Sequence, residues 1–179
     1  MSQWKVYSEH DLYFVTTTIV DWQYVFTSNS RFQIIVEALR YCIRHKGLQL
    51  HAYVIMPNHA HYILSTNANV SLSDVMRDMQ RYTARQLISA LINERSYSLL
   101  AVFRNAAKLD QLGNSFKVWQ DGFHPVTIGS KRFARQKLLY LHDNPVRKGF
   151  VEHPEDWKYS SARNYRNDDY SLLPVDFIF

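Results

Sequence analysis

Apolar and polar residues alternate along the first part of the chain in two patterns, one typical of strands and one typical of helices. Residues 11–20 are rich in β-branched and aromatic types, which favours a strand. From about Ser30 to His45, apolar residues recur at intervals of three and four, the period of an amphipathic helix, and Gly47 follows as a helix stop. The pattern therefore predicts a strand followed by a helix.

Two further strands are predicted on either side of a short turn. Leu48 to Met56 and His59 to Ser65 are both mainly apolar, and Pro57-Asn58 separates them. Proline fixes φ at one central position of a tight turn, and asparagine tolerates positive φ at the next. We expect the second strand to fold back antiparallel on the first.

The middle of the chain predicts one long helix and a less regular stretch. Ser71 and Asp74 have the spacing of a capping box, and the apolar residues behind them keep helical spacing to about Asn93. Residues 94–115 are mixed in character, with weak helical content over 101–109 and a turn at Gly113-Asn114, and we expect a loop excursion there.

A strand or hairpin is expected over residues 116–128, followed by a third helix that begins at Ser130. That helix should end near Asp143, because Asn144 precedes Pro145 and a residue before proline is pushed out of the α region.

The predicted order is strand, helix, strand, strand, helix, strand, helix. It is the order of a ferredoxin-like split βαβ unit with one extra helix, an α+β fold in which an antiparallel sheet is packed with helices. We expect a single domain over residues 1–179, with a core at about 11–145. Residues 146–179 carry enough aromatic surface to form a C-terminal wrap on that core.

Composition narrows the class of protein. Apolar residues make up 46% of the 179 and charged residues 21%, as in ordinary globular proteins, which excludes wholesale disorder. No apolar run approaches the roughly 20 residues that span a bilayer, and the single cysteine, Cys42, permits no internal disulfide. We expect a cytoplasmic protein without a membrane partner. The net charge of +5 suggests a polyanionic partner without establishing one.

His59-Ala60-His61 is the sharpest local feature. Side chains alternate along a strand, so both imidazoles should face one side while Ala60 enters the core. Two such imidazoles can converge on one cation, and imidazole suits Mn, Zn, Ni or Cu better than Mg. An isolated pair of this kind is more often two strand histidines without a ligand, so the pair alone does not establish a metal site.

The third predicted helix adds a second chemical group. Its apolar stripe is formed by Ala134, Leu138, Leu141 and Pro145. Tyr140 lies roughly 120° from the centre of that stripe, and Lys137 and Asn144 fall on the same side as Tyr140. A nucleophile, a cation and an amide ligand would share one face. The alternative is a tyrosine at the rim of the helix with its hydroxyl in water.

Phosphodiester chemistry gives these groups a common purpose. A phenol has a pKa of about 10 and attacks a phosphodiester slowly, whereas a cation on the scissile phosphate neutralises charge and positions the phosphorus. The product would be a 5′-phosphotyrosine with a free 3′-hydroxyl, and reversal onto another strand end would rejoin DNA.

Basic residues offer a possible DNA track. Arg77, Arg81 and Arg85 are spaced by four on the second predicted helix, and Lys131, Arg132 and Arg135 open the third. Charged helix faces are usually only solvated. Trp119 is a further candidate for stacking on a base, although core packing is the more common fate of a tryptophan.

Four segments of the chain resemble single-tyrosine HUH transposases, with the branch called REP-associated tyrosine transposases as the best match. They are Met56 to His61, Val118 to His124, Tyr140 to Gly149, and Pro154 to Ala162. The segments occur in the order found in the family and span most of the chain from the second strand to the tail. Residues 94–115 match no motif of the family.

The resemblance implies a ferredoxin-like or RRM-like domain in which His59 and His61 bind metal and Tyr140 is the nucleophile. Insertion-sequence members place glutamine four residues after the tyrosine as a third ligand, where this chain has Asn144. A divalent cation, Mg²⁺ or Mn²⁺, is the expected cofactor.

The substrate implied by the resemblance is single-stranded DNA beside a short imperfect hairpin, a REP-like palindrome. We expect metal-dependent cleavage and rejoining by a monomer, or by a homodimer as in insertion-sequence members. One alternative is a non-catalytic module that binds DNA or RNA hairpins. Another is a metal-dependent hydrolase that uses activated water in place of Tyr140.

Overall fold

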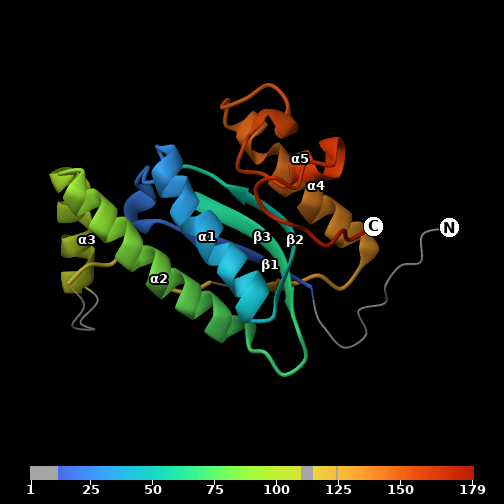
Figure 1. The fold of residues 1–179 in the computed structure, drawn as a ribbon, viewed down its shortest axis with the longest axis horizontal. Helices are drawn as coiled ribbons and strands as arrows, with labels where there is room; N and C mark the ends of the chain where they lie inside the picture. Colours follow the sequence, from blue (N-terminus) through green and yellow to red (C-terminus); the bar gives the residue numbers. More distant parts are fainter. Residues whose placement is uncertain (1–11, 110–114, 124) are drawn as a thin grey trace.

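A four-stranded antiparallel sheet forms the centre of the molecule (Figure 1). The computed structural model describes residues 12–109, 115–123 and 125–179. The strands are β1 (Tyr13–Thr18), β2 (Leu48–Ile55), β3 (His59–Thr66) and β4 (Val126–Thr127). They are ordered β2-β3-β1-β4, and each neighbouring pair is antiparallel. This is the strand order of a ferredoxin-like unit, so the predicted fold class is confirmed.

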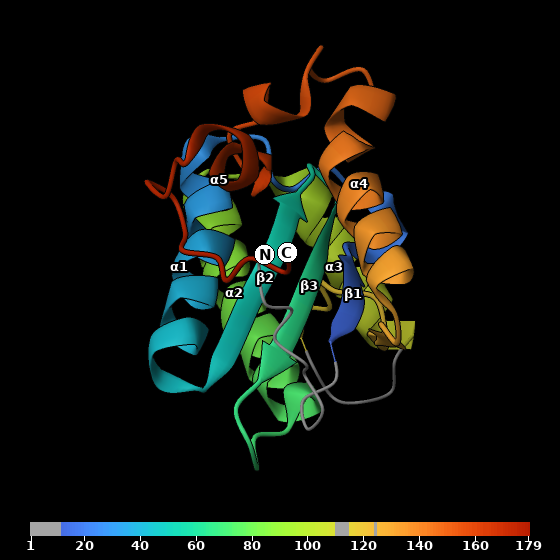
Figure 2. The ribbon, with the colours of Figure 1, turned by 90° about the vertical axis from the view of Figure 1, so that its right-hand side faces the viewer.

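Helices cover both faces of this sheet (Figure 2). α1 (Asn29–His45) and α2 (Leu72–Asn93) pack on one face, in a core that includes Val15 of β1 and Tyr62 of β3. α4 (Lys131–Arg147) packs on the other face, where it meets Phe14 and Ile63. Consecutive residues of β1 and β3 thus point to opposite layers, as the period of two in a strand requires.

Serine side chains cap the first turns of α2 and α4, the two helices whose starts were predicted at Ser71 and Ser130. The Ser71 side chain accepts a hydrogen bond from the Asp74 backbone N–H at the start of α2, and Ser130 does the same for Phe133 at the start of α4. α1 begins at Asn29 and is capped by Ser28, slightly earlier than predicted.

The expected loop over residues 94–115 is in large part a helix, α3 (Tyr97–Leu109). Leu100, Phe103 and Ala107 are buried at helical spacing, and the first two belong to the main core. The turn from α2 is short because Arg95 adopts a left-handed backbone with φ of 55°. The expected turn at Gly113-Asn114 lies outside the described residues.

The prediction of a strand or hairpin over residues 116–128 is also mostly wrong, because only Val126–Thr127 of the described residues there forms a strand. The backbone of the preceding residues bonds to separate segments: the Lys117 N–H donates to Phe103 and the Gln120 N–H donates to Thr18. Such scattered partners do not form a ladder. His124 lies outside the described residues.

α4 does not end at Asn144-Pro145 as predicted but continues to Arg147. Its end is set by Gly149, which has a φ of 73°, and by the Phe150 N–H, which donates to the Pro145 carbonyl over 2.9 Å. This is the hydrogen-bond pattern of a Schellman motif. Proline loses one helical hydrogen bond without stopping the helix. Asn144 consequently stays within α4, one turn after Tyr140.

The C-terminal segment covers the outer edge of β2. The Ile55 N–H donates to the Tyr159 carbonyl, and the Ser161 and Asp176 N–H groups donate to the carbonyls of Tyr53 and Leu50. These bonds satisfy backbone groups that a bare edge strand would expose. The same segment contains the short helices η2 (Pro154–Asp156) and α5 (Ala162–Asn167). No helix of the described residues combines the length and apolar character needed to cross a membrane.

One buried histidine on α4 should make the fold sensitive to acid. His142 lies against Ser161, 2.8 Å from Nε2 to Oγ, and burial lowers its pKa to about 4, assisted by the charge of Arg166. The unfolded chain takes up this proton near pH 6.5 and the folded chain only near pH 4. The stability contributed by neutral His142 is therefore complete above pH 6.5 and is lost progressively as pH falls to about 4, by roughly 3 kcal/mol.

We expect His142→Gln, which keeps a donor to Ser161 but cannot be protonated, to flatten the loss of stability between pH 6.5 and 4. Urea unfolding of the metal-free protein across this pH range measures the effect. Every other histidine is common to both proteins, so the difference between the two curves isolates His142. Parallel curves would show that His142 contributes nothing to acid sensitivity.

Candidate functional site

His59 and His61 begin β3 and point to the layer occupied by α4. Both are buried, and their ring centroids are 4.8 Å apart, whereas Ala60 points into the opposite core. The strand is entered through the turn at Pro57-Asn58, which is closed by the Met56 N–H donating to the His59 carbonyl. The predicted side-by-side placement of the two imidazoles is confirmed.

Each histidine is oriented by one neighbour at Nδ1. Nδ1 of His59 lies 2.7 Å from Oδ1 of Asn58, and Nδ1 of His61 lies 2.8 Å from the Thr16 hydroxyl. An amide oxygen only accepts hydrogen bonds, so His59 donates from Nδ1 and its Nε2 keeps a lone pair. This is the arrangement in which a second group fixes the tautomer of a ligating histidine.

Both rings are neutral at neutral pH. Burial lowers the pKa of His59 to about 4, and the charge of Lys148 acts in the same direction, while the amide of Asn144 opposes it. Burial also lowers the pKa of His61 to about 3, with further contributions from His59 and Lys137. Because a metal ion binds only unprotonated imidazole, the pair is in its ligating form.

Tyr140 extends from α4 over this histidine pair. Its ring centroid lies 5.5 Å from that of His61, and its side chain is 39% exposed, so it is open to a substrate on one side. Two cations lie near the ring: the Lys137 ammonium at 5.8 Å and the Arg147 guanidinium at 5.5 Å from its centroid. The predicted grouping of a tyrosine with Lys137 on one helix face is present.

The side-chain oxygen of Asn144 is suited to bind a cation. Asn144 is buried on α4 with its amide close enough to His59 to raise the pKa of that imidazole, yet its Oδ1 receives no hydrogen bond of good geometry. A buried amide oxygen without a partner is costly, and a cation held by this oxygen and the two imidazoles would satisfy it. No group of three His, Cys, Asp or Glu side chains suited to a metal occurs among the described residues.

Replacing Asn144 should separate stability from metal binding. We expect Asn144→Leu, of similar volume, to stabilise the metal-free protein by about 1 kcal/mol, because it removes an unsatisfied buried oxygen. The same change should weaken Mn²⁺ binding at least about tenfold, while Asn144→Asp should preserve it. Chelator-treated protein in urea and calorimetric Mn²⁺ titration measure the two quantities. Unchanged Mn²⁺ affinity in Asn144→Leu would remove Asn144 from the ligand set.

The remaining predicted DNA contacts are spread over the molecule. Lys131 and Arg132 are exposed at the start of α4, the helix that carries Tyr140. The stripe of Arg77, Arg81 and Arg85 lies on α2, which packs on the opposite face of the sheet from α4. Arg77 also pairs with two aspartates of α2. The structure therefore does not bring this stripe to the histidines.

Trp119 is in the core and not at a surface. It is buried against Phe26, and its indole N–H donates to the Thr83 hydroxyl over 3.1 Å. The expectation that it stacks on a base is wrong for this structure, and the alternative of core packing holds. Val118-Trp119 lies on a segment pinned to Val20 and Thr18, which the periodicity of residues 116–128 did not indicate.

Sequence reasoning missed Trp22, which ends the short helix η1 (Val20–Trp22). Its ring centroid lies 5.7 Å from that of His59, and the side chain is exposed. The sequence gives one indication of this position, because Trp22 stands between the polar residues Asp21 and Gln23, where exposure is expected.

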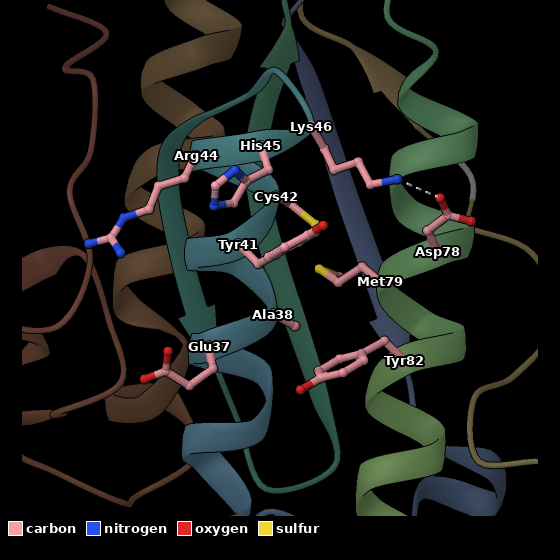
Figure 3. Close-up of a pocket in the computed structure, with 10 residues that line it drawn as sticks. All are labelled: Glu37, Ala38, Tyr41, Cys42, Arg44, His45, Lys46, Asp78, Met79 and Tyr82. Atoms are coloured by element: carbon pink, nitrogen blue, oxygen red, sulfur yellow. Dashed lines mark hydrogen bonds and ion pairs between the residues drawn. The ribbon is translucent and has the colours of Figure 1, made fainter.

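A separate hollow of about 640 Å³ lies between α1 and α2 (Figure 3). These helices pack on the face of the sheet opposite to α4, which carries Tyr140. The rings of Tyr41 and Tyr82 reach into it from the two helices, over Cys42 and Met79. Burial raises the pKa of the Cys42 thiol to about 11, so the thiol is protonated and unreactive. This hollow shares no residue with the histidine cluster.

The fold, together with His59, His61 and Tyr140, defines a class of protein. It is a ferredoxin-like protein in which a buried histidine pair on a strand faces a tyrosine on a helix. Comparison with known families makes the class specific. Residues 14–144 match the family described as "Transposase IS200 like", and the chain belongs to that family. The resemblance seen in the sequence is thereby confirmed, and membership supports an enzyme that acts on DNA in transposition.

Two relatives agree with this assignment. A protein of Haemophilus influenzae (strain Rd), provisionally named a REP-associated tyrosine transposase, is 26% identical over 141 residues, which are 78% of this chain and 72% of the relative. A solved structure of a REP-associated tyrosine transposase bound to a REP hairpin is 20% identical, with a TM-score of 0.64. The match covers 99% of this chain and 91% of that chain, and it shows the same fold.

Proposed function

We propose that this transposase cleaves and rejoins single-stranded DNA beside a hairpin, with a divalent metal ion and through a 5′-phosphotyrosine at Tyr140. The observation that carries the proposal is the convergence on α4 of Tyr140, beside His61, and of the unpartnered Oδ1 of Asn144, beside His59. A nucleophile and a site fitted to a cation share one face of one helix.

The metal-binding residues would be His59, His61 and Asn144, with Mg²⁺ or Mn²⁺ as the ion. Such an ion, when bound, neutralises charge on the scissile phosphate and positions the phosphorus for attack. Asn58 and Thr16 hold the two imidazoles in orientation through their Nδ1 atoms. Burial keeps both rings neutral, and therefore able to ligate, well below neutral pH.

Tyr140 would carry the covalent step. Its Oη forms a bond to the phosphorus while the bond from phosphorus to the 3′-oxygen breaks, and the phenol proton passes through solvent to that 3′-oxygen. The products are a 5′-phosphotyrosine and a free 3′-hydroxyl, and the reverse reaction reseals a strand. Lys137 and Arg147, both near the ring, would stabilise negative charge on the phosphate.

Hairpin-bearing single-stranded DNA is the proposed partner because a relative with this fold is bound to a REP hairpin. The chain would act as a monomer or a homodimer, and Tyr140 lies beside His61 of its own chain. The test is incubation of the protein with a library of hairpin-flanked single strands and Mn²⁺ or Mg²⁺. A covalent protein–DNA adduct that forms only with metal supports the proposal, whereas hairpin binding without any adduct favours a binding module.

A further inference from the structure

An exposed tryptophan lies beside the histidine pair, at the end away from Tyr140. The rings of Trp22 and His59 are inclined by 68° in a T-shaped contact, at 5.7 Å between centroids, while Tyr140 contacts His61. The Trp22 side chain is nevertheless 56% exposed, so most of the ring surface is open to a ligand. His59 and His61 therefore lie between a tyrosine and an open aromatic surface.

The loop that carries Trp22 is fastened to the turn that leads into the histidines. The Ile19 N–H donates to the Asn58 carbonyl and the Val25 N–H donates to the Pro57 carbonyl, both over 2.9 Å. The Asn58 side-chain amide donates to the Trp22 carbonyl over 3.2 Å. Because Asn58 also orients His59, one residue ties the tryptophan and the ligand histidine together.

The backbone at Asp21 and Trp22 is strained, although both side chains are exposed. Asp21 and Trp22 have φ values of 52° and 54°, in the left-handed region. Bulky residues rarely adopt it, because the Cβ atom crowds the neighbouring carbonyl. Strain of this kind persists where the surrounding structure enforces it, and it is concentrated at functional sites. Here it holds an exposed ring against the proposed metal site.

We propose that Trp22 stacks on the base of the leaving nucleotide, the one that retains the free 3′-hydroxyl after cleavage. The inference rests on the proposed function. In an in-line displacement the leaving 3′-oxygen departs on the side opposite to the attacking Tyr140 oxygen, and Trp22 lies at that opposite end of the histidine pair. Aromatic rings bind unpaired bases by stacking with little sequence preference.

Stacking at this place assigns Trp22 a role in rejoining. After cleavage the 5′-phosphate is held covalently by Tyr140, but the 3′-hydroxyl strand is held only by noncovalent contacts. A base retained on Trp22 keeps the 3′-oxygen near the phosphotyrosine. That oxygen then forms the new bond to phosphorus while the bond to Tyr140 breaks and the phenol regains a proton. Loss of the ring should reduce rejoining more than cleavage.

Binding alone gives the first test. In a Tyr140→Phe background with Mn²⁺, Trp22→Gly should bind a short thymidine oligonucleotide on the order of tenfold more weakly, and Trp22→Phe should bind nearly as well as its parent. Glycine adopts positive φ freely, so the variant removes the ring without adding strain. The matched control is Tyr41→Ala, because Tyr41 is also 56% exposed but lies on the other face of the sheet. Equal affinity in Trp22→Gly and its parent, or an equal loss in Tyr41→Ala, would overturn the stacking role.

The second test uses the active protein and a strand whose cleaved position has been mapped from the adduct. Trp22→Gly should accumulate adduct and reseal on the order of tenfold less product than wild type. An abasic leaving nucleotide should reduce resealing by wild type but not by Trp22→Gly, and an abasic nucleotide on the tyrosine-linked side should affect both alike. If instead the abasic nucleotide on the tyrosine-linked side affected wild type but not Trp22→Gly, Trp22 would stack on that base and not on the leaving one. Absence of any adduct with wild type contradicts the proposed function, whereas the binding test then still decides whether Trp22 stacks on DNA.

Discussion

Tyr140→Phe is expected to abolish the covalent protein–DNA adduct while leaving DNA binding intact. The change removes only the hydroxyl and keeps the ring that contacts His61 and Phe14. Because the ring is partly exposed and lies outside the buried clusters, folding should be unaffected. Without the phenol oxygen no bond to phosphorus forms, and we expect adduct yield to fall by at least about a thousandfold. Denaturing electrophoresis of labelled hairpin strands measures the adduct.

A second tyrosine provides the control for this experiment. Tyr82 is exposed on α2, on the far face of the sheet, and Tyr82→Phe should form adduct at the wild-type rate. Two outcomes would contradict the assignment of Tyr140. Adduct in Tyr140→Phe would place the nucleophile elsewhere, and undiminished strand cleavage without adduct would favour hydrolysis by an activated water.

The part of the site that the sequence predicted is the part fixed by local periodicity. The period of two places His59 and His61 on one side of β3, and the helical period places Lys137 one turn before Tyr140. Both rules act within one element, so they need no knowledge of the tertiary fold. The resemblance to a family then indicated that the strand and the helix face each other.

What the sequence did not predict depends on contacts between distant segments. Periodicity shows that Arg77, Arg81 and Arg85 share a helix face, but not that α2 packs on the sheet face away from Tyr140. Trp22 is placed by hydrogen bonds of its loop to Pro57 and Asn58, which leave no local pattern.

Two further predictions from the sequence were wrong: the end of α4 at Pro145 and the loop over residues 94–115. Pro145 predicts the end of a helix from its local preference, but the bonds at Gly149 and Phe150 extend α4 by one turn. This extension keeps Arg147 on the helix, where its guanidinium reaches the ring of Tyr140. In α3, Leu100, Phe103 and Ala107 are buried at helical spacing, so the expectation of a loop there overlooked a helical period that the chain does carry.

Substitution of the histidine pair is expected to remove metal-dependent activity. His59→Ala or His61→Ala takes away one of the two nitrogens proposed to bind the metal and should lower adduct formation by about two orders of magnitude or more. Mn²⁺ affinity, measured by titration calorimetry, should fall in parallel, because the remaining imidazole and the Asn144 amide are weak ligands alone. His45→Ala, an exposed histidine on α1, is the matched control and should keep both properties.

Chelation distinguishes this explanation from a structural effect of the histidines. Wild-type protein treated with EDTA should lose adduct formation and regain it with Mn²⁺ or Mg²⁺, whereas the two alanine variants should not regain it at the same metal concentration. Metal-free thermal unfolding of each variant shows whether the fold is retained, since the Thr16 and Asn58 hydrogen bonds are lost with the rings. Adduct formation by wild type in EDTA would exclude a metal-dependent reaction. A folded His61→Ala that binds Mn²⁺ as tightly as wild type would instead show that the cation is held by other residues.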